Sequence, residues 1–425
     1  MWATLETERT ALLVVHNTTT LNRLLDLIDV LAGDRRVQCL ATSELEDPFA
    51  DRLPGEVEAV GLAAIPWQQA ARADVDLILS TSHHGRLADL HGPLVLLPHG
   101  AGFGKYSPGT STGARTVFGL APEWLLHDGH PLAAALGVPH PDQIGVLAEQ
   151  VPAAVTGAVV IGDRTFDRIL ASLPCRRRYR AALGVPDGGR LVVISSTWGA
   201  CGTLGTWPQL PGRLLDEVLT DDVRVALVAH PNIWAWHGPY QLRAWLTDAV
   251  DRGLLLVPPL QGWQAALVAA DVVVGDHGSV TVYGAALGRP TLLAAFPSDD
   301  VVPGTAAALL GRSASRLDPG RGLSEQLGAC MQGWTPEDSA AIAELVTSVP
   351  GEASARLAAL FSGLLRLDVP LTPAPARPYG LPIPTGNDGR LAAPLPVPGG
   401  DVPCSPGSTR SPLGDPDTVS RTPGP

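Results

Sequence analysis

The sequence predicts an α/β protein built from two Rossmann-like, doubly wound domains and a disordered C-terminal tail rich in Pro and Gly. Short apolar runs alternate with longer amphipathic stretches in two separate series, and Pro and Gly dominate the last part of the chain. Apolar runs with polar ends are typical of parallel strands that are buried on both faces. The amphipathic stretches between them are typical of crossover helices.

The first series predicts an N-terminal domain over residues 1–155. It begins with the apolar run "ALLVVHN" at 11–17. A stretch with Leu and Ile at helical spacing follows, for which Gly33 is a suitable C-cap. Three further apolar runs predict strands at 36–42, 75–82 and 92–100.

An Arg-rich helical segment then predicts a linker over residues 156–190. The second series predicts a C-terminal domain over 191–367, closed by a helix near its end. The Pro- and Gly-rich residues 368–425 offer too little apolar surface to offset their chain entropy, which predicts disorder there. The strand-like runs of the second domain are 191–199, 223–232, 253–260, 270–279 and 289–297.

Composition excludes several classes of protein. The net charge of −12 argues against a protein that coats nucleic acid or adheres to anionic lipid through a basic patch. The five cysteines show no CxxC spacing, which argues against a zinc site and favours a reducing compartment. No apolar run is long enough to cross a bilayer. We therefore expect a cytoplasmic protein with at most a weak peripheral contact at the inner face of the membrane.

The turn "GDHGS" is the clearest candidate site. A buried strand breaks at Gly275, passes Asp276 and Gly278, and enters a helix at Ser279, which suits an N-cap or first-turn position. Free backbone N–H groups and the helix dipole make such a turn an anion site, with phosphate as the usual occupant. The alternative is a capped helix in which these side chains only satisfy its N–H groups.

Two other strand ends of the second domain carry polar residues. His230 directly follows the strand "VALVA", and we expect it to project into a cleft between the domains. Ser196 and Thr197 leave the strand "LVVIS" for a Gly-rich loop, where their hydroxyls can hold phosphate or ribose. The alternative for His230 is a surface histidine at a turn. The alternative for Ser196 and Thr197 is an ordinary polar strand end.

The first domain contributes "LPHGAGFGKY", which contains Lys105, the only lysine of the chain. His99 stands at a strand end, where a neutral imidazole can act as a general base. Lys105 can neutralise a phosphate beside it, or it can be a solvated loop residue. No nucleophile-elbow, P-loop or HExxH motif is present, and no carboxylate cage indicates a metal or another cofactor.

Taken together, these segments resemble the CDP-glycerol glycerophosphotransferases, the teichoic-acid polymerase family with a GT-B fold. The likeness spans about residues 90–300, with His277 and Gly278 standing where that family has Tyr and Ser. The matching residues are His99-Gly100 with Lys105, Ser196-Thr197-Trp198, His230-Pro231, Asp276-His277-Gly278-Ser279-Val280 and Gly288-Arg289-Pro290.

The resemblance implies a transferase of cell-wall polymer synthesis with a nucleotide-diphosphate donor such as CDP-glycerol on the C-terminal domain. His99 would take the proton of an acceptor hydroxyl as that oxygen attacks the glycerol-phosphate phosphorus, His230 would donate to a phosphate oxygen, and CMP would leave. A sugar transferase or epimerase that uses a UDP-sugar, and a catalytically silent nucleotide-binding module, are the two alternatives. The residues implied in donor-phosphate binding are Ser196, Thr197, Asp276, Gly278 and Ser279, with Lys105 as the loop cation.

Overall fold

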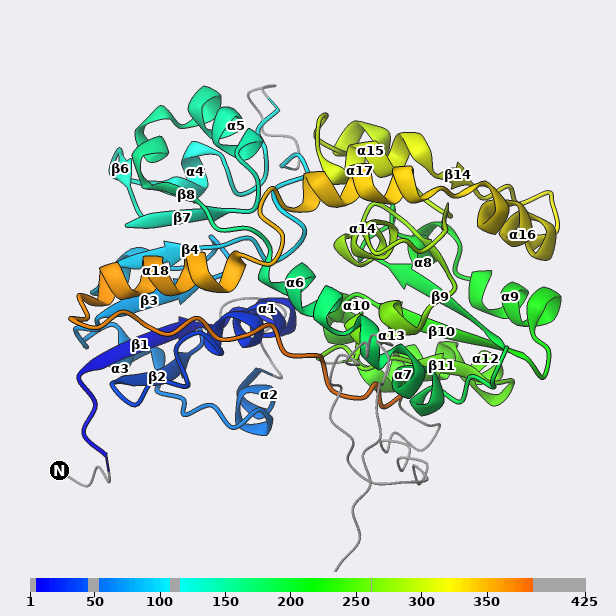
Figure 1. Cartoon of the computed structure of the whole chain (residues 1–425), viewed down its shortest axis with the longest axis horizontal. Helices are drawn as coiled ribbons and strands as arrows, with labels where there is room; N and C mark the ends of the chain where they lie inside the picture. Colours follow the sequence, from blue (N-terminus) through cyan, green and yellow to red (C-terminus); the bar gives the residue numbers. More distant parts are fainter. Residues whose placement is uncertain (1–4, 45–52, 108–114, 261, 385–425) are drawn as a thin grey trace, which may run out of the picture.

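The computed structural model describes residues 5–44, 53–107, 115–260 and 262–384. Figure 1 shows two α/β units side by side, each built on a parallel six-stranded sheet, which confirms the predicted fold class. The N-terminal sheet has the order β2-β1-β3-β4-β7-β8. Its strands are β1 (Arg9–Val14), β2 (Val37–Thr42), β3 (Leu77–Ser80), β4 (Leu94–Leu96), β7 (Ala135–Val138) and β8 (Ala158–Val160), and β5 (Leu126–His127) and β6 (His130–Pro131) form a separate hairpin.

The C-terminal sheet has the order β11-β10-β9-β12-β13-β14. β10 and β11 are added on one side of β9, and β12, β13 and β14 are added on its other side. The direction in which the strands are added therefore reverses between β9 and β12. Ligands of open α/β sheets bind at such a reversal, outside the carboxyl ends of the strands. The strands are β9 (Arg190–Ser196), β10 (Val223–Ala229), β11 (Leu254–Leu256), β12 (Val272–Gly275), β13 (Thr291–Leu293) and β14 (Ser315–Arg316).

Helices cover both sheets. Those before the linker are α1 (Thr18–Ile28), α2 (Leu53–Ala59), α3 (Trp67–Ala70), α4 (Pro122–Leu125) and α5 (Asp142–Gln150), and the linker holds α6 (Arg164–Ala171) and α7 (Arg176–Ala182). Those of the second domain are α8 (Thr203–Thr206), α9 (Leu210–Val218), α10 (Pro231–His237), α11 (Pro239–Trp245), α12 (Thr247–Asp251), α13 (Trp263–Ala269), α14 (Ser279–Ala286), α15 (Ala306–Ser313), α16 (Leu323–Gly333) and α17 (Pro336–Val346).

The last helix, α18 (Ala353–Leu365), does not close the C-terminal domain as the sequence suggested. It returns to the N-terminal sheet, where Leu357 and Phe361 are fully buried in one core with Leu13 and Leu79. The periodicity of α18 shows that one face is apolar, but not which sheet covers that face.

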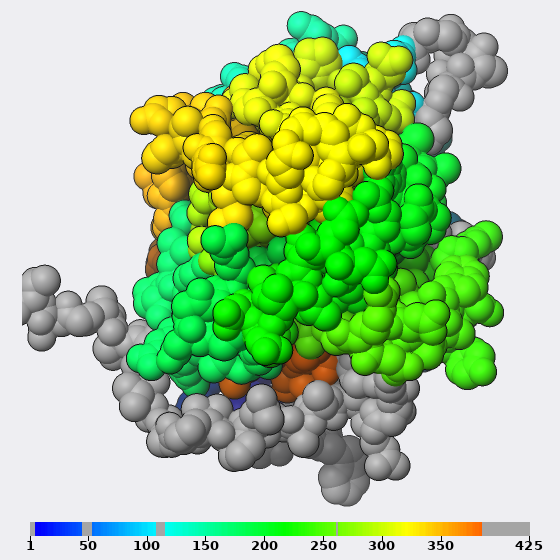
Figure 2. All heavy atoms as spheres, turned by 90° about the vertical axis from the view of Figure 1, so that its right-hand side faces the viewer, coloured from blue at the N-terminus to red at the C-terminus, as the bar shows by residue number. Residues whose placement is uncertain are grey.

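The segment that follows α18 differs from the expectation of disorder as far as residue 384. In Figure 2 its dark orange atoms lie against the green atoms of the second domain. Leu371 is buried, and the Tyr379 hydroxyl donates a hydrogen bond to Asp26 at 2.9 Å. Specific hydrogen bonds and a few buried side chains therefore order a Pro-rich segment that has no secondary structure. Residues 385–425 lie outside the described part of the chain.

Three free thiols, Cys39, Cys201 and Cys330, occur among the described residues. Within the described residues, every helix is too short or too polar to cross a membrane.

Buried polar side chains join the two domains. Arg23 on α1 forms a two-pronged ion pair with Asp163, with N–O distances of 3.1 Å. The Tyr283 hydroxyl on α14 donates to the same carboxylate at 2.7 Å. Arg23 also donates through Nε to the carbonyl oxygen of Pro98 at 3.1 Å, so this cluster supports the residue that precedes His99. The relative position of the domains is thus fixed directly beneath the loop that carries His99.

Candidate functional site

The site lies at the carboxyl ends of β9, β10 and β12, where the strand order of the second sheet reverses. A loop of the N-terminal domain, residues 97–107 after β4, faces these strand ends. The structure brings the sequence-predicted residues of both domains to this one region, because His99, His230 and Lys105 are close enough for their charges to interact.

Asp276 organises the turn after β12. It is fully buried, and burial raises the pKa of its carboxyl group. One of its oxygens accepts hydrogen bonds from the backbone amides of Thr197 and Thr203, both at 2.8 Å, and the other accepts from the amide of Gly278 at 2.8 Å. Both oxygens therefore hold the loop after β9 against the turn, so Asp276 has a positioning role at the site.

Ser279 is the first residue of α14, and Gly278 precedes it as the N-cap. The Ser279 hydroxyl oxygen accepts a hydrogen bond from the backbone amide of Ala101 at 3.2 Å, across the boundary between the domains. The N-terminus of this eight-residue helix is thus formed jointly with the loop after β4. The N–H groups of its first turn and the helix dipole are the features on which the sequence-based prediction of an anion site rests.

Lys105 is attached to both domains. Its carbonyl oxygen accepts from the amide of Phe118 at 2.9 Å, and it forms an antiparallel bridge with Val301 of the second domain. The amide of Tyr106 donates to the carbonyl of Asp300 at 3.0 Å. The backbone of Lys105 is therefore held by both domains.

The Lys105 ammonium carries positive charge into the middle of the site. Burial lowers its pKa, and the carboxylates of Asp276 and Asp300 oppose that change through space. Burial lowers the pKa of the imidazoles of His99, His230 and His277, and the charge of Lys105 lowers it further. Within the described residues, Asp276 and Asp300 act on the Lys105 ammonium through space.

His99 is positioned as a proton acceptor. Its ring is accessible to solvent, but protein surrounds it, and the loss of bulk water lowers its pKa to about 4. Its Nδ1 lies 3.2 Å from the carbonyl oxygen of Thr81. Because a carbonyl can only accept, Nδ1 carries the proton and Nε2 has a free lone pair.

His230 has the opposite tautomer. Its Nδ1 accepts a hydrogen bond from the backbone amide of Asn232 at 3.1 Å, so the proton of the neutral ring is on Nε2. Burial, the nearby Lys105 and His99 lower its pKa to about 3. The site therefore offers one imidazole that accepts a proton and one that donates a hydrogen bond.

The two hydroxyls after β9 differ in their surroundings. Ser196 donates to the carbonyl of Thr197 at 2.8 Å and accepts from the amide of Leu204 at 3.0 Å, so it stabilises its own loop. Thr197 lines a pocket beside the site. Sequence reasoning named both residues but could not separate these environments.

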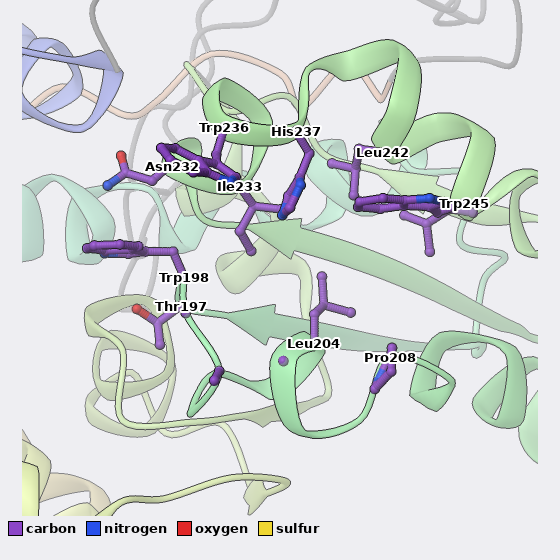
Figure 3. A pocket seen from close by; sticks show the side chains of 14 residues that line it. Thr197, Trp198, Leu204, Pro208, Asn232, Ile233, Trp236, His237, Leu242 and Trp245 are labelled. Atoms are coloured by element: carbon purple, nitrogen blue, oxygen red, sulfur yellow. The ribbon is translucent and has the colours of Figure 1, made fainter. Parts of the chain in front are cut away.

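Sequence reasoning missed two features. The Nδ1 atom of His277 is buried and has no hydrogen-bond partner among the described residues. A pocket lined by tryptophans also adjoins Thr197 (Figure 3), and no pocket was predicted there from the sequence. Within the described residues, no group of three His, Cys, Asp or Glu side chains is arranged to bind a metal ion.

Comparison with solved structures identifies the fold. A variant of the wall teichoic acid polymerase TagF soaked with CDPG matches with a TM-score of 0.56 and 14% identity, over 84% of this chain and 88% of that one. A candidate UDP-N-acetylglucosamine 2-epimerase from Listeria monocytogenes matches with a TM-score of 0.52 and 14% identity, over 86% and 98%. These likenesses establish a GT-B-like fold. No protein-family model matches the chain, and no curated protein sequence matches it significantly.

Proposed function

We propose that this protein is a transferase that binds a nucleotide-diphosphate donor at the N-terminus of α14 and moves a glycerol-phosphate or related group to an acceptor hydroxyl. The complementary tautomers of His99 and His230, both close enough to Lys105 to interact with its charge, carry this proposal. One ring can remove a proton while the other donates to an oxygen on phosphorus.

The donor phosphates would lie at the free N–H groups of α14, with Gly278 allowing the backbone to approach them. Lys105 would neutralise the charge that develops on the phosphate oxygens, and Nε2–H of His230 would donate to one of them. Preorganised donors of this kind are usually the largest contribution to rate. Asp276 would act indirectly, by holding the turn and the loop after β9 together.

His99 Nε2 would accept the proton of the acceptor hydroxyl as its oxygen forms a bond to the phosphorus of the transferred group. The bond from that phosphorus to the bridging oxygen breaks, and the nucleoside monophosphate leaves with both electrons. The low pKa of free His99 keeps its lone pair available near neutral pH. A bound phosphate raises that pKa and makes the ring a stronger base. Such a base is typically worth about 10²–10⁴-fold in rate.

The direct test is a panel of donors. Purified protein is incubated with CDP-glycerol, UDP-glucose and UDP-N-acetylglucosamine in the presence of glycerol-phosphate acceptors, and release of CMP or UDP is measured. We expect CMP release from CDP-glycerol, and loss of that release in His99→Ala. Epimerisation of UDP-N-acetylglucosamine, or UDP release, would favour the UDP-sugar function instead.

A binding measurement separates an enzyme from a nucleotide sensor. CDP and UDP are titrated by calorimetry into wild-type protein and into His230→Ala. Loss of one charge-assisted hydrogen bond should cost roughly 1.5–3 kcal/mol of binding free energy. Tight binding without turnover of any donor would indicate a silent binding module. Wild-type affinity in His230→Ala would contradict the assignment of this site to the phosphates. The cytoplasmic location is part of the same proposal.

A further inference from the structure

Two groups of helix α1 hold the backbone around His99. The Nε atom of Arg23 donates to the carbonyl oxygen of Pro98, the residue before His99, at 3.1 Å. The carbonyl oxygen of Thr20, three residues earlier on α1, accepts a hydrogen bond of 3.3 Å from the Thr81 hydroxyl. The Thr81 carbonyl is in turn the group that lies 3.2 Å from Nδ1 of His99. The orientation of the imidazole therefore depends on α1 through two separate contacts.

The guanidinium group of Arg23 is itself fixed by several partners. Its two terminal nitrogens donate to the two carboxylate oxygens of Asp163, each at 3.1 Å, and Nη1 also donates to the Thr165 hydroxyl. Both members of this ion pair are buried. Asp163 is the N-cap of α6 and accepts from the amide of Phe166 at 2.9 Å. Because a planar fork paired with a carboxylate has one orientation, Nε is held toward Pro98.

The same carboxylate holds the helix of the candidate anion site. The Tyr283 hydroxyl on α14 donates to Asp163 at 2.7 Å, and Ser279 is the first residue of that helix. Asp163 is thus shared by α14 and, through Arg23, by the loop that carries His99. Buried atoms therefore set the separation between His99 and the N-terminus of α14.

We propose that Arg23 is the positioning residue of His99, because it keeps the imidazole in the tautomer with a free Nε2 lone pair and at a fixed place relative to α14. It acts through Pro98 and does not touch the reacting atoms. Burial is the main cause of the low pKa of His99, and the charges of Lys105 and Arg23 lower it further. This inference rests on the proposed role of His99 as the proton acceptor.

Arg23→Lys is the informative variant. Lysine keeps the charge beside Asp163, but it lacks the fork and the Nε–H group that reaches Pro98. Nitrogen NMR of ¹⁵N-histidine protein reports the tautomers. We expect the ratio of the Nδ1–H to the Nε2–H form of His99 to fall by roughly 5-fold, the value of one ordinary hydrogen bond. His230 is the internal reference, because the partner of its Nδ1 atom is an amide of α10, so its tautomer should not change.

Arg168→Lys is the matched control. Arg168 also pairs with a buried carboxylate, that of Asp26, at 2.7 Å, and its other hydrogen bond goes to the carbonyl of Arg377. We expect His99 to keep its wild-type tautomer in this variant. Equally mixed tautomers in both variants would mean that the core is loosened in general, and that Arg23 has no specific role.

Turnover provides a second readout. On the donor that the panel identifies, Arg23→Lys should lower kcat by about 10²-fold, because misplacement of the base weakens proton transfer. The affinity for CDP should change little, since Tyr283 still attaches α14 to Asp163. Equal losses of turnover and of CDP affinity would indicate a purely structural role.

One measurement on the wild-type protein needs no variant. The Nε–H group of Arg23, assigned through its contacts with Pro98, should exchange with D₂O far more slowly than those of exposed arginines. Exchange as fast as theirs would overturn the proposal even if Arg23→Lys did not fold. An unchanged His99 tautomer in folded Arg23→Lys would also overturn it. The proposed function fails separately, through wild-type CDP affinity in His230→Ala.

Discussion

The backbone amide of Ala101 donates a hydrogen bond to the Ser279 hydroxyl at 3.2 Å, although the two residues belong to different domains. The same approach brings Gly100 so close that a Cβ at that position would lie 2.4 Å from the Ser279 oxygen. A side chain at position 100 would therefore have to displace the Ser279 hydroxyl, and with it the hydrogen bond from Ala101. The junction of the domains is therefore built into the proposed phosphate site.

We predict that Gly100→Ala displaces the Ser279 hydroxyl, breaks its hydrogen bond with Ala101 and weakens CDP binding. Overpacking by one methyl group usually costs about 1–3 kcal/mol. If this strain falls on the CDP-bound state, the affinity should fall by roughly 5–150-fold. Calorimetry with CDP measures the affinity, and thermal melting shows whether the variant folds.

The double variant Gly100→Ala with Ser279→Ala is its control. Removing the serine oxygen leaves the Ser279 Cβ as the next atom, at 3.4 Å from the added methyl group, which is an ordinary contact. The double variant should thus bind CDP better than Gly100→Ala alone. If the double variant binds CDP no better than Gly100→Ala alone, the close approach of Gly100 and Ser279 has no part in binding.

The tautomers of His99 and His230 can be observed directly. In the free protein their pKa values of about 4 and about 3 lie below the usual 6.5, so both rings should stay neutral between about pH 5 and 8. Nitrogen NMR of ¹⁵N-histidine protein should show the proton on Nδ1 of His99 and on Nε2 of His230.

Binding of CDP should raise both pKa values, because the diphosphate charge favours the imidazolium forms. Because both pKa values rise, the protein should take up protons when CDP binds near pH 6. Calorimetry in buffers of different ionisation enthalpy measures this uptake. Proton release, or titration of either ring near pH 6.5 in the free protein, would contradict the assigned environments.

The sequence predicts the strands well because each carries an unbroken apolar run. All five strand-like runs of the second series form strands of the C-terminal sheet. Three strands of the two sheets were not predicted. The neighbourhood of β7, "PLAAALGV", is rich in alanine, β8 lies within the predicted linker, and β14 has only two residues. The position of α18 was also missed, because local periodicity does not say which sheet a helix covers.

The site residues could be named from the sequence because strand ends of parallel sheets meet at one edge. The partners of each side chain could not be predicted, since they depend on distant contacts. The backbone amides of Thr197 and Thr203, which donate to Asp276, follow β9. The amide of Ala101, which donates to the Ser279 hydroxyl, belongs to the other domain. Residues 368–384 show the same limit, because their composition predicts disorder while distant partners order them.

That segment should contribute measurable stability. Chains truncated after residue 384 and after Leu367 are compared by thermal melting, and we expect the shorter one to melt more than about 5 °C lower. The shorter chain loses the buried Leu371 and the hydrogen bond from Tyr379 to Asp26. Tyr379→Phe alone should cost about 1 kcal/mol of the free energy of unfolding. Equal melting of the two truncated chains would mean that the segment is not bound to the body.

The single lysine provides the sharpest test of the site. Lys105 is half-buried, acts on three imidazoles, and has its backbone held by Phe118 and Val301. Lys105→Arg keeps the charge but places a wider, planar group in this space, where it would displace the phosphate from His99. Misplacement at a reacting centre can cost on the order of 10²-fold, so we expect that loss in turnover with an unchanged melting temperature.

Arg35→Lys, an exposed exchange on the N-terminal domain, is the matched control and should leave both quantities within experimental error. Steady-state rates on the donor that the panel identifies decide the matter: wild-type turnover by Lys105→Arg would show that the ammonium does not touch the reacting phosphate.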